Sequence, residues 1–221
     1  MLVIVGSSGG LGSSLVKKFR DSKQFSGELV EVTRSQMDLG SSRSVEDFFS
    51  SLVKRVEPGE RIQLVNAAGV SINGMAHKLS DESWSQVLDT NLTGTFRLLR
   101  AFYNLARQHP GSSATVFSSV VAQMGVPGTA AYAASKSGLT GLVRTLSQEW
   151  GRSGLRVNGI HLGYFDKGMI QQVSREQQEA LVQRVPLGRL GNEDDLYEAC
   201  LFCFQCQYLT GSMIHLNGGL L

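Results

Sequence analysis

The sequence predicts an α/β fold in which helices cover both faces of a parallel sheet. Short apolar runs alternate with amphipathic segments along nearly the whole chain, a pattern typical of strands joined by crossover helices. The first apolar run leads directly into a glycine-rich turn and then a helix. With 221 residues, 42% of them hydrophobic, the chain is long enough for one domain with a sizeable core. We therefore expect a single doubly wound, Rossmann-type domain over residues 1–221.

The first strand is expected at residues 2–5, followed by a helix that places Leu15, Val16 and Phe19 on its apolar side and ends near Lys23. Between them lie Gly6, Ser7, Ser8, Gly10, Leu11 and Gly12. Glycines let the backbone approach a pyrophosphate, and a helix N-terminus adds free N–H groups and a positive dipole end. The spacing G-x-x-x-G-x-G differs from the commoner G-x-G-x-x-G, but its place after an N-terminal strand favours a phosphate-binding turn.

The second strand is expected at residues 28–33, and Arg34 follows it. NAD-selective folds place an acidic residue near the end of this strand, where it holds the ribose 2′-OH, whereas an arginine suits a 2′-phosphate. Arg34 could also be an ordinary surface residue. Because no aspartate occupies the matching place, we expect NADP(H) to be preferred, with NAD(H) as the alternative.

The connection after the second strand is unusually short. Only residues 36–39 separate Ser35 from the next helix, which Ser41 or Ser42 would cap. Its core side would contain Val45, Phe48, Phe49 and Leu52. A complete doubly wound half needs a crossover helix here, and the segment is too short for one. We expect that helix to be shortened or absent and a very short third strand to remain.

The remaining strands are expected at residues 62–69, 114–118, 156–162 and 212–216. Helices are expected from Ser80, over about 91–107, 132–151 and 174–182, and over 193–204. The irregular segment 164–185 is long enough to cover a pocket. The strand over 62–69 ends in small residues, which leave space for a ligand at the carboxyl edge of the sheet: Asn66, Ala67, Ala68 and Gly69.

Tyr132 and Lys136 are four residues apart, so on a helix their side chains share a face. A tyrosine hydroxyl has an ordinary pKa of about 10, and a lysine ammonium beside it would lower that pKa by up to roughly 3 pH units. Such a tyrosine can exchange a proton with a carbonyl or alcohol oxygen. Ser119, at the end of a predicted strand, could hydrogen-bond the same oxygen. Taken alone, however, the spacing of Tyr132 and Lys136 is also typical of an ordinary helix surface. Serines after strands are commonly turn residues.

The bulk properties exclude several classes of protein. A net charge of +2 without basic runs argues against a nucleic-acid or membrane-surface protein, and no apolar stretch is long enough to span a bilayer. The first residues lack a basic region and a cleavage-site pattern, so we expect a strand and no signal peptide. We expect a cytoplasmic protein, although a mature organellar protein would have the same features.

The three cysteines, Cys200, Cys203 and Cys206, are each three residues apart, which on a helix places them along one side. They could form a metal or redox site or be small buried apolar residues. No fourth ligand lies at zinc-like spacing, which favours buried packing and no metal site.

Taken together, the motifs resemble those of the short-chain dehydrogenase/reductase family over nearly the whole chain. The matching motifs, in order, are Gly6-x-x-x-Gly10-x-Gly12, Asp38-Leu39, Asn66-Ala-Ala-Gly69, Asn91, Ser119, Tyr132-x-x-x-Lys136 and Arg156-Val-Asn158. The runs around Ser119, Tyr132 and Arg189 resemble those of bacterial 3-oxoacyl-(acyl-carrier-protein) reductases, although reductases of other substrates contain them too.

This resemblance implies a catalytic set: Tyr132 as the general acid/base, Lys136 to lower its pKa and hold the nicotinamide ribose, and Ser119 to orient the carbonyl. Asn91, which by itself is better explained as a polar core residue than as a helix start, would anchor a water in a proton relay. Together with Arg34, the implied cofactor contacts are Gly6, Ser7, Ser8, Gly10, Leu11, Gly12, Asp38, Leu39, Asn66, Ala67, Ala68, Gly69, Tyr132, Lys136, Gly163 and Phe165. Asp38 would bind the adenine amine.

The chain departs from the family pattern at several positions. Val5 replaces the usual threonine, Gly9 a basic residue that contacts the 2′-phosphate, and Lys167 a threonine near the nicotinamide. Leu162-Gly163 stands where the family has Pro-Gly. The arginines that dock the acyl carrier protein fall on Pro110 and Ser153, and the cations that could replace them are Arg107, His109, Arg152 and Lys167.

The sequence therefore predicts an NADPH-dependent reductase of a small carbonyl compound or an acyl thioester, with acyl carrier protein as a possible partner and a role in fatty acid biosynthesis. The alternatives are a reductase of a pterin, sugar, steroid or xenobiotic ketone, and a regulatory protein that binds NADP(H) without turnover. The resemblance also implies a homotetramer or homodimer packed through the helices at 91–107 and 132–151.

Overall fold

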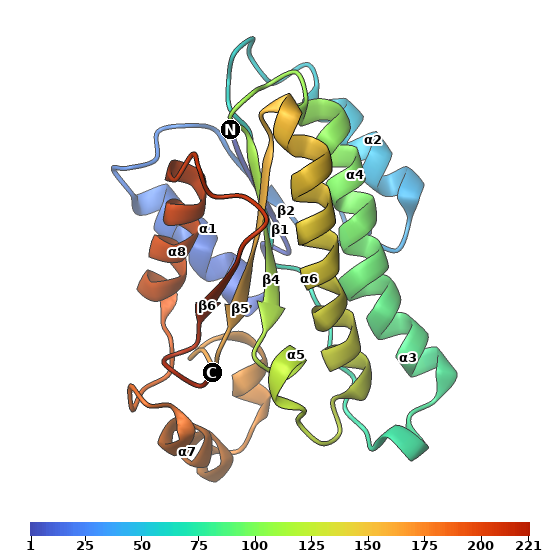
Figure 1. The fold of residues 1–221 in the computed structure, drawn as a ribbon, viewed down its shortest axis with the longest axis vertical. Helices are drawn as coiled ribbons and strands as arrows, with labels where there is room; N and C mark the ends of the chain where they lie inside the picture. The colour runs from blue at the N-terminus through green and yellow to red at the C-terminus, as the bar shows by residue number, and fades with distance from the viewer.

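A computed structural model of the protein describes the backbone of residues 1–221 and every side chain except that of Gln172. Within these residues, six parallel strands form one sheet in the order β2-β1-β3-β4-β5-β6 (Figure 1). The strands are β1 (Leu2–Val5), β2 (Leu29–Val32), β3 (Gln63–Asn66), β4 (Ser113–Ser119), β5 (Arg156–Leu162) and β6 (Met213–Leu216). The single-domain α/β prediction is confirmed.

Helices cover both faces of the sheet. The α-helices are α1 (Gly10–Asp21), α2 (Ser42–Leu52), α3 (Asp81–Leu88), α4 (Gly94–Ala106), α5 (Val121–Met124), α6 (Ala130–Trp150), α7 (Arg175–Arg184) and α8 (Glu193–Gln205). Helices α1 and α8 pack together on one face, whereas α2, α4 and α6 cover the other (Figure 1). A π-helical segment, η2 (Asp89–Thr93), joins α3 to α4, and three short 3-10 helices are η1 (Ala76–Lys78), η3 (Gly151–Ser153) and η4 (Gly168–Gln172).

Side-chain caps explain where several helices begin. The Ser41 hydroxyl accepts from the N–H of Ser44 at α2, and the Ser80 hydroxyl accepts from the N–H of Ser83 at α3. Asn192 forms a reciprocal capping box with Asp195 at α8. Each cap satisfies N–H groups that the first helical turn leaves free, which is why these starts could be predicted from the sequence.

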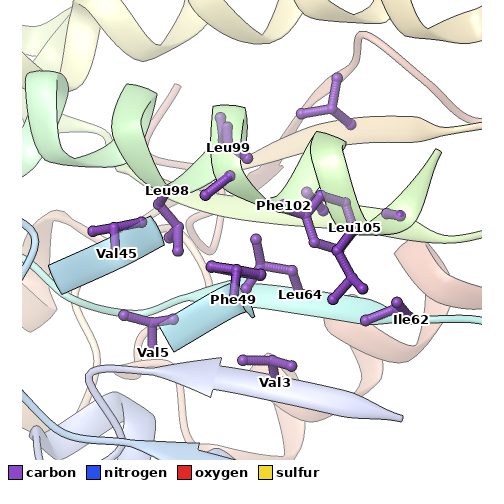
Figure 2. Packing of buried hydrophobic residues seen from close by; sticks show 14 of the residues in the cluster. Val3, Val5, Val45, Phe49, Ile62, Leu64, Leu98, Leu99, Phe102 and Leu105 are labelled. Carbon is purple, nitrogen blue, oxygen red and sulfur yellow. The ribbon is translucent and has the colours of Figure 1, made fainter. Parts of the chain in front are cut away.

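The core consists of two apolar layers, one on each face of the sheet. In β1, Val3 and Val5 point toward α2 and α4, whereas Leu2 and Ile4 point toward α1 and α8. Figure 2 shows the first layer, where Phe49 of α2 and Phe102 of α4 meet the strands. Both faces of a parallel sheet are buried, and this is why β1 is a continuous apolar run.

The predicted third strand, over residues 36–39, is wrong. In the part of the chain that the structure describes, no strand lies between β2 and α2, and residues 34–36 form a turn. The Gln36 side chain holds that turn, because its Oε1 accepts from the N–H and the hydroxyl of Thr33, both at 2.9 Å. The crossover helix is absent, as predicted, and β2 is consequently an edge strand.

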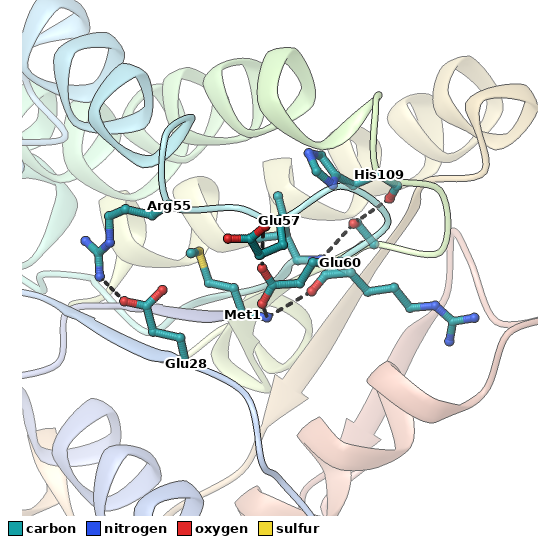
Figure 3. Close-up of polar contacts among 9 residues, drawn as sticks. Met1, Glu28, Arg55, Glu57, Glu60 and His109 are labelled. Carbon is teal, nitrogen blue, oxygen red and sulfur yellow. Dashed lines mark hydrogen bonds and ion pairs between the residues drawn. The ribbon is translucent and has the colours of Figure 1, made fainter.

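Polar contacts close the amino edge of the sheet (Figure 3). The Met1 amino group donates to the Glu60 carboxylate at 2.6 Å and to the Arg61 carbonyl at 3.0 Å, while Arg55 pairs with Glu28. The Met1 ammonium holds the pKa of Glu60 below its ordinary value. This edge is the one opposite to the carboxyl ends of the strands.

Cys200 and Cys203 lie on α8 and are buried among the apolar side chains that face α1, which confirms their packing role. Burial raises the pKa of both thiols, to about 11 for Cys203. Cys206 is the C-cap of α8 and is half-buried. Separately, among the described residues no helix is both long and apolar enough to cross a membrane.

Candidate active site

The predicted site residues gather where the strand order reverses. Strands β1 and β3 are neighbours in the sheet, and the chain leaves them at Gly6 and Asn66. The helices that follow the two strands lie on opposite faces of the sheet. In open α/β sheets this switch point forms a crevice at the carboxyl ends of the strands. Ser119 ends β4, the next strand along the same edge, which lies at the lower end of Figure 1.

The glycine-rich turn is packed too tightly for side chains. Gly6 has a φ of +79°, and a Cβ there would lie 2.7 Å from the main-chain nitrogen of Ala68. A Cβ at Gly12 would lie 2.1 Å from the Gly6 carbonyl oxygen. These contacts bring the start of α1 down onto the ends of β1 and β3, which explains the predicted glycine spacing.

The start of α1 offers donors suited to a pyrophosphate. Its N-cap, Gly9, provides no side-chain cap, and no acidic residue lies in the first turn. Among the described residues, the N–H groups of Leu11 and Gly12 have no main-chain acceptor, and the neighbouring Ser8 is exposed. Free donors at the positive end of a helix fit an anionic group, so this chain can hold a dinucleotide phosphate there.

The catalytic candidates Ser119, Tyr132 and Lys136 form one cluster. The Lys136 Nζ lies 5.7 Å from the centre of the Tyr132 ring and donates to the Phe117 carbonyl of β4 at 2.8 Å. The Ser119 hydroxyl contacts the Tyr132 hydroxyl and also accepts from the N–H of Val121 at 3.2 Å. Helix α6 thus supplies the phenol and the amine, and the end of β4 supplies the hydroxyl.

The expected direction of the Tyr132 pKa is wrong for this structure. Burial raises the pKa of Tyr132 above its ordinary value, and the hydrogen bond with Ser119 opposes this only in part. Burial also lowers the pKa of Lys136 to about 8. The four-residue spacing indicates the charge beside the tyrosine, whereas burial of each group determines the direction of its pKa in the folded chain.

Asn91 is a polar core residue, one of the two alternatives open from the sequence. It is fully buried within η2, and its Oδ1 and Nδ2 bond the main-chain N–H and carbonyl of Val70, both at 2.8 Å. Its Nδ2 also donates to the Ser135 hydroxyl at 3.0 Å. π-Helical turns occur frequently at functional sites, and this one directs Asn91 between the loop after β3 and helix α6.

Lys136 and Asn91 meet at Gly69. A Cβ at Gly69 would lie 3.3 Å from the Lys136 Nζ and 3.4 Å from the Asn91 Oδ1. The small residues after β3 therefore make room for the amine. Asn66 itself works within the fold: its Nδ2 donates to the Thr95 hydroxyl at 2.9 Å, and its Oδ1 accepts from the N–H of Ala68 at 3.1 Å. Ala67 donates its N–H to the Val5 carbonyl at 2.9 Å.

Two supporting residues escaped the sequence analysis. The Ser118 hydroxyl donates to the Lys136 carbonyl at 2.9 Å, and the Ser135 hydroxyl donates to the Tyr132 carbonyl at 2.8 Å. They fasten α6 to β4 and to Asn91, and so fix the directions of Tyr132 and Lys136. Both are next to predicted residues in the sequence, but nothing in a serine's local pattern indicates which distant atom it will bond.

The residues predicted at the adenosine end lie at the carboxyl end of β2. Arg34 is 84% exposed, and its Nε is 3.9 Å from Asp38 Oδ1, which also accepts from the N–H of Gly40 at 3.1 Å. Leu39 is buried against Gly94 of α4, where a Cβ on Gly94 would be 2.9 Å from that of Leu39. Arg34 is thus free to reach a ligand, whereas the Leu39 side chain belongs to the core.

Gly163 and Phe165 begin a segment that we call the strap, residues 163–173. The close approach of the Gly163 backbone to Asn217 leaves no room for a side chain, because a Cβ would lie 2.7 Å from the Asn217 Cα. The Phe165 ring packs against Gly191 in the core layer that faces α1 and α8. The Phe165 side chain therefore belongs to the core.

The candidate cations for docking a carrier protein do not form one patch. Arg107 follows α4 and Arg152 lies in η3, after α6, so both lie with His109 near the amino edge of the sheet, at the upper end of Figure 1. Lys167 lies in the strap, at the opposite edge. Both helices run against the strand direction, which carries their C-terminal cations away from the site. Within one chain, the four candidate cations therefore lie at opposite edges of the sheet.

The chain is similar in sequence to a known family and to known reductases. A family model described as "Enoyl-(Acyl carrier protein) reductase" matches residues 14–221. The 3-oxoacyl-(acyl-carrier-protein) reductase FabG of Escherichia coli K12 is 34% identical over 168 residues, which cover 75% of this chain and 69% of that protein. FabG of Rickettsia felis is 32% identical over 232 residues, with 99% and 95% coverage.

A solved structure shares the fold over almost the full length. It is provisionally described as a short-chain alcohol dehydrogenase of Sinorhizobium meliloti 1021 and superposes with a TM-score of 0.87. It covers 99% of this chain and 95% of its own, at 24% sequence identity. At that identity the likeness concerns the fold alone.

Proposed function

The chain belongs to the short-chain dehydrogenase/reductase family of NAD(P)-dependent oxidoreductases, and on this premise we propose that it reduces a carbonyl to an alcohol with NADPH. The observation that carries the proposal is the cluster of Ser119, Tyr132 and Lys136 beside the crevice between β1 and β3. The Lys136 Nζ lies 5.7 Å from the Tyr132 ring, and the Ser119 hydroxyl contacts the Tyr132 hydroxyl. A protein that only binds a nucleotide has no need of this buried set.

In the proposed reaction, a bound nicotinamide supplies hydride to the carbonyl carbon. Tyr132 donates its proton to the carbonyl oxygen, and its raised pKa keeps that proton in place at neutral pH. The Ser119 hydroxyl orients the same oxygen. Lys136 remains mostly protonated below its pKa of about 8, and its charge favours the phenolate that proton transfer leaves behind.

Asn91 and Gly69 complete this arrangement. The Asn91 side chain fixes the loop after β3 against α6, and Gly69 leaves space beside the Lys136 amine. A proton relay that returns a proton to Tyr132 through Lys136 is consistent with this proximity. NADPH is proposed over NADH because Arg34 is exposed and no acidic residue occupies the turn at residues 33–36.

For the substrate we propose a 3-oxoacyl thioester, reduced to the 3-hydroxy form. The FabG relatives support this class. Arg189 itself pairs with the capping residue Asp195 at 2.6 and 2.9 Å and so serves the start of α8. The separated docking cations favour the alternative, a free small molecule such as a pterin, sugar, steroid or xenobiotic ketone.

The test is NADPH oxidation by the wild-type protein and by Tyr132→Phe. The variant should bind cofactor and lose about 10²–10⁴-fold in turnover, because only the titrating hydroxyl is removed. Tyr208→Phe, at a fully exposed tyrosine, is the matched control and should keep the wild-type rate. More than about a tenth of the rate in Tyr132→Phe would contradict the role of Tyr132.

The substrates compared should be carrier-linked acetoacetate, a small acetoacetyl thioester, free ketones and a crotonyl thioester. Faster reduction of the carrier-linked form, slowed by salt, supports a carrier-protein partner. Equal rates on both acetoacetyl forms indicate a small-molecule substrate. The crotonyl compound tests reduction of a carbon–carbon double bond, which the description of the family model names. Binding of NADPH without turnover of any substrate would favour a regulatory protein.

A further inference from the structure

The strap lies directly on the glycine-rich turn. A Cβ at Gly10 would be 2.3 Å from the nitrogen and 2.5 Å from the Cα of Gly168, and 3.3 Å from the main-chain carbon of Lys167. Gly168 has a φ of +80°, and its own Cβ would be 3.8 Å from the Leu11 side chain. Gly10 therefore allows the backbone of the strap to touch the first turn of α1, and Gly168 provides the positive φ of the strap at that contact.

This contact places Lys167 beside the free N–H groups of Leu11 and Gly12. The Lys167 side chain is exposed, and a lysine side chain is long enough to extend from this backbone position over the helix start. The N-cap is Gly9, so the turn supplies no cation of its own. The strap brings a positive charge to a place where helix dipole and donors already favour an anion.

The other lysines near α1 are engaged elsewhere. Lys18 pairs with Asp194 at 2.5 Å and Lys17 lies 4.0 Å from Glu193, both toward α8. Among the described side chains, Lys167 has no carboxylate within ion-pair distance. The nearest acidic residue in sequence is Asp166, which is also exposed and whose N–H donates to the Gly191 carbonyl at 2.9 Å.

We propose that Lys167 binds the pyrophosphate of the nicotinamide cofactor, as a cation that the strap supplies to the glycine-rich turn. The inference rests on the proposed cofactor site and adds a residue to it. The pyrophosphate is common to NADPH and NADH, so Lys167 strengthens the binding of both. Arg34, at the other end of the crevice, acts on the 2′-phosphate alone.

The test measures dissociation constants by calorimetry for NADPH, NADH and ADP-ribose, which has the pyrophosphate but no nicotinamide. Lys167→Ala should weaken all three ligands by the same factor, roughly 5- to 10-fold for an exposed charge-assisted contact, and Lys167→Arg should restore binding. Added salt should shrink the difference from wild type. Lys54→Ala, an exposed lysine at the amino edge, is the control and should change nothing.

Several outcomes would overturn the inference: unchanged affinity in Lys167→Ala, a loss confined to NADPH, or a Lys167→Arg variant as weak as Lys167→Ala. Equal melting temperatures of the variants show that the strap still folds. If the wild-type protein bound none of the three ligands, the inference and the proposed cofactor site would both fail. If it bound them but reduced no carbonyl, only the reductase proposal would fail, and the Lys167 comparison would still decide this inference.

Discussion

Lys136 is a titratable residue whose pKa is clearly changed by folding. It is 5% exposed, and burial lowers its pKa to about 8. Tyr132, the proposed proton donor, has a pKa raised above its ordinary value. The two groups therefore lose their protons in the order lysine first, tyrosine second, which separates their contributions to any pH profile.

Turnover in the reducing direction should fall by half near pH 8, when Lys136 loses its charge, and well before Tyr132 titrates. Profiles of kcat between pH 6 and 10 at saturating NADPH measure this. Because the folded pKa of Lys136 lies below its unfolded value of about 10.4, the unfolded state binds more protons between these values. The contribution of Lys136 to the free energy of unfolding thus rises with pH over that range. Melting temperatures measured over the same pH range distinguish the fall in turnover from unfolding of the protein. A kcat that stays constant up to pH 10 would refute the role of Lys136.

Arg34 is the residue expected to select the cofactor. Arg34→Ala should weaken NADPH about tenfold and leave NADH unchanged, because the lost contact is worth about 1.5 kcal/mol at an exposed site and reaches only the 2′-phosphate. Dissociation constants for both cofactors measure the effect, with Lys54→Ala as the control. Wild-type constants that are equal for NADPH and NADH would be inconsistent with this selection.

At the scale of the elements, the end of α8 depends on one buried residue of β5. The Arg156 guanidinium donates to the carbonyls of Cys203 at 2.7 Å, Phe204 at 2.8 Å, Cys206 at 3.1 Å and Leu209 at 3.3 Å. These include the last carbonyls of the helix, which have no partners within it. The motif residue Arg156 therefore fastens α8 to the sheet and takes no part in the proposed chemistry.

Arg156→Met should lower the free energy of unfolding by about 3 kcal/mol, because it removes four hydrogen bonds and leaves the buried Cys203 carbonyl without a donor. The other three carbonyls keep one donor each, from Gln207, the N–H of Leu209 and Asn158. Urea denaturation measures the change. Arg156→Lys keeps the charge but has fewer donors, so its free energy of unfolding should lie between those of the wild-type protein and Arg156→Met. A loss below about 1 kcal/mol would mean that water replaces the guanidinium without penalty.

For the whole molecule, the surface formed by α4 and α6 is the expected contact between copies of the chain. A groove of 290 Å³ runs between these helices, lined by Phe96, Arg100, Tyr103, Leu146, Glu149 and Trp150. Phe96 is 42% exposed, and the Arg100 guanidinium lies 5.5 Å from its ring centre. The family resemblance predicts oligomers that pack through these two helices.

Phe96→Asp should convert such an oligomer to smaller species, because it places a charge on an exposed apolar residue of the expected contact surface. Sedimentation velocity at micromolar concentration measures the change. Val53→Asp substitutes an exposed apolar residue at the C-cap of α2 and should leave the oligomer intact. A wild-type chain that sediments as a monomer would contradict the predicted interface.

Local patterns determined most of the architecture. The apolar runs predicted each of the observed strands, and the caps at Ser41 and Ser80 marked helix starts, because side-chain periodicity and capping involve neighbours in the sequence. The absence of the crossover helix could be predicted from the length of the connection after the second strand alone. The predicted strand at 36–39 failed because a strand also needs a partner at the sheet edge, and the Gln36 side chain closes a turn there instead.

Only the tertiary structure decided the electrostatics and the supporting contacts of the site. The direction of the Tyr132 pKa depends on burial by segments far apart in the sequence, so spacing on one helix could not predict it. The bonds of Ser118 and Ser135, the contact of Gly168 with Gly10 and the separation of Lys167 from Arg152 likewise depend on how the elements pack. The sequence alone specified which residues lie at the strand ends, whereas through-space packing determined their charge states and partners.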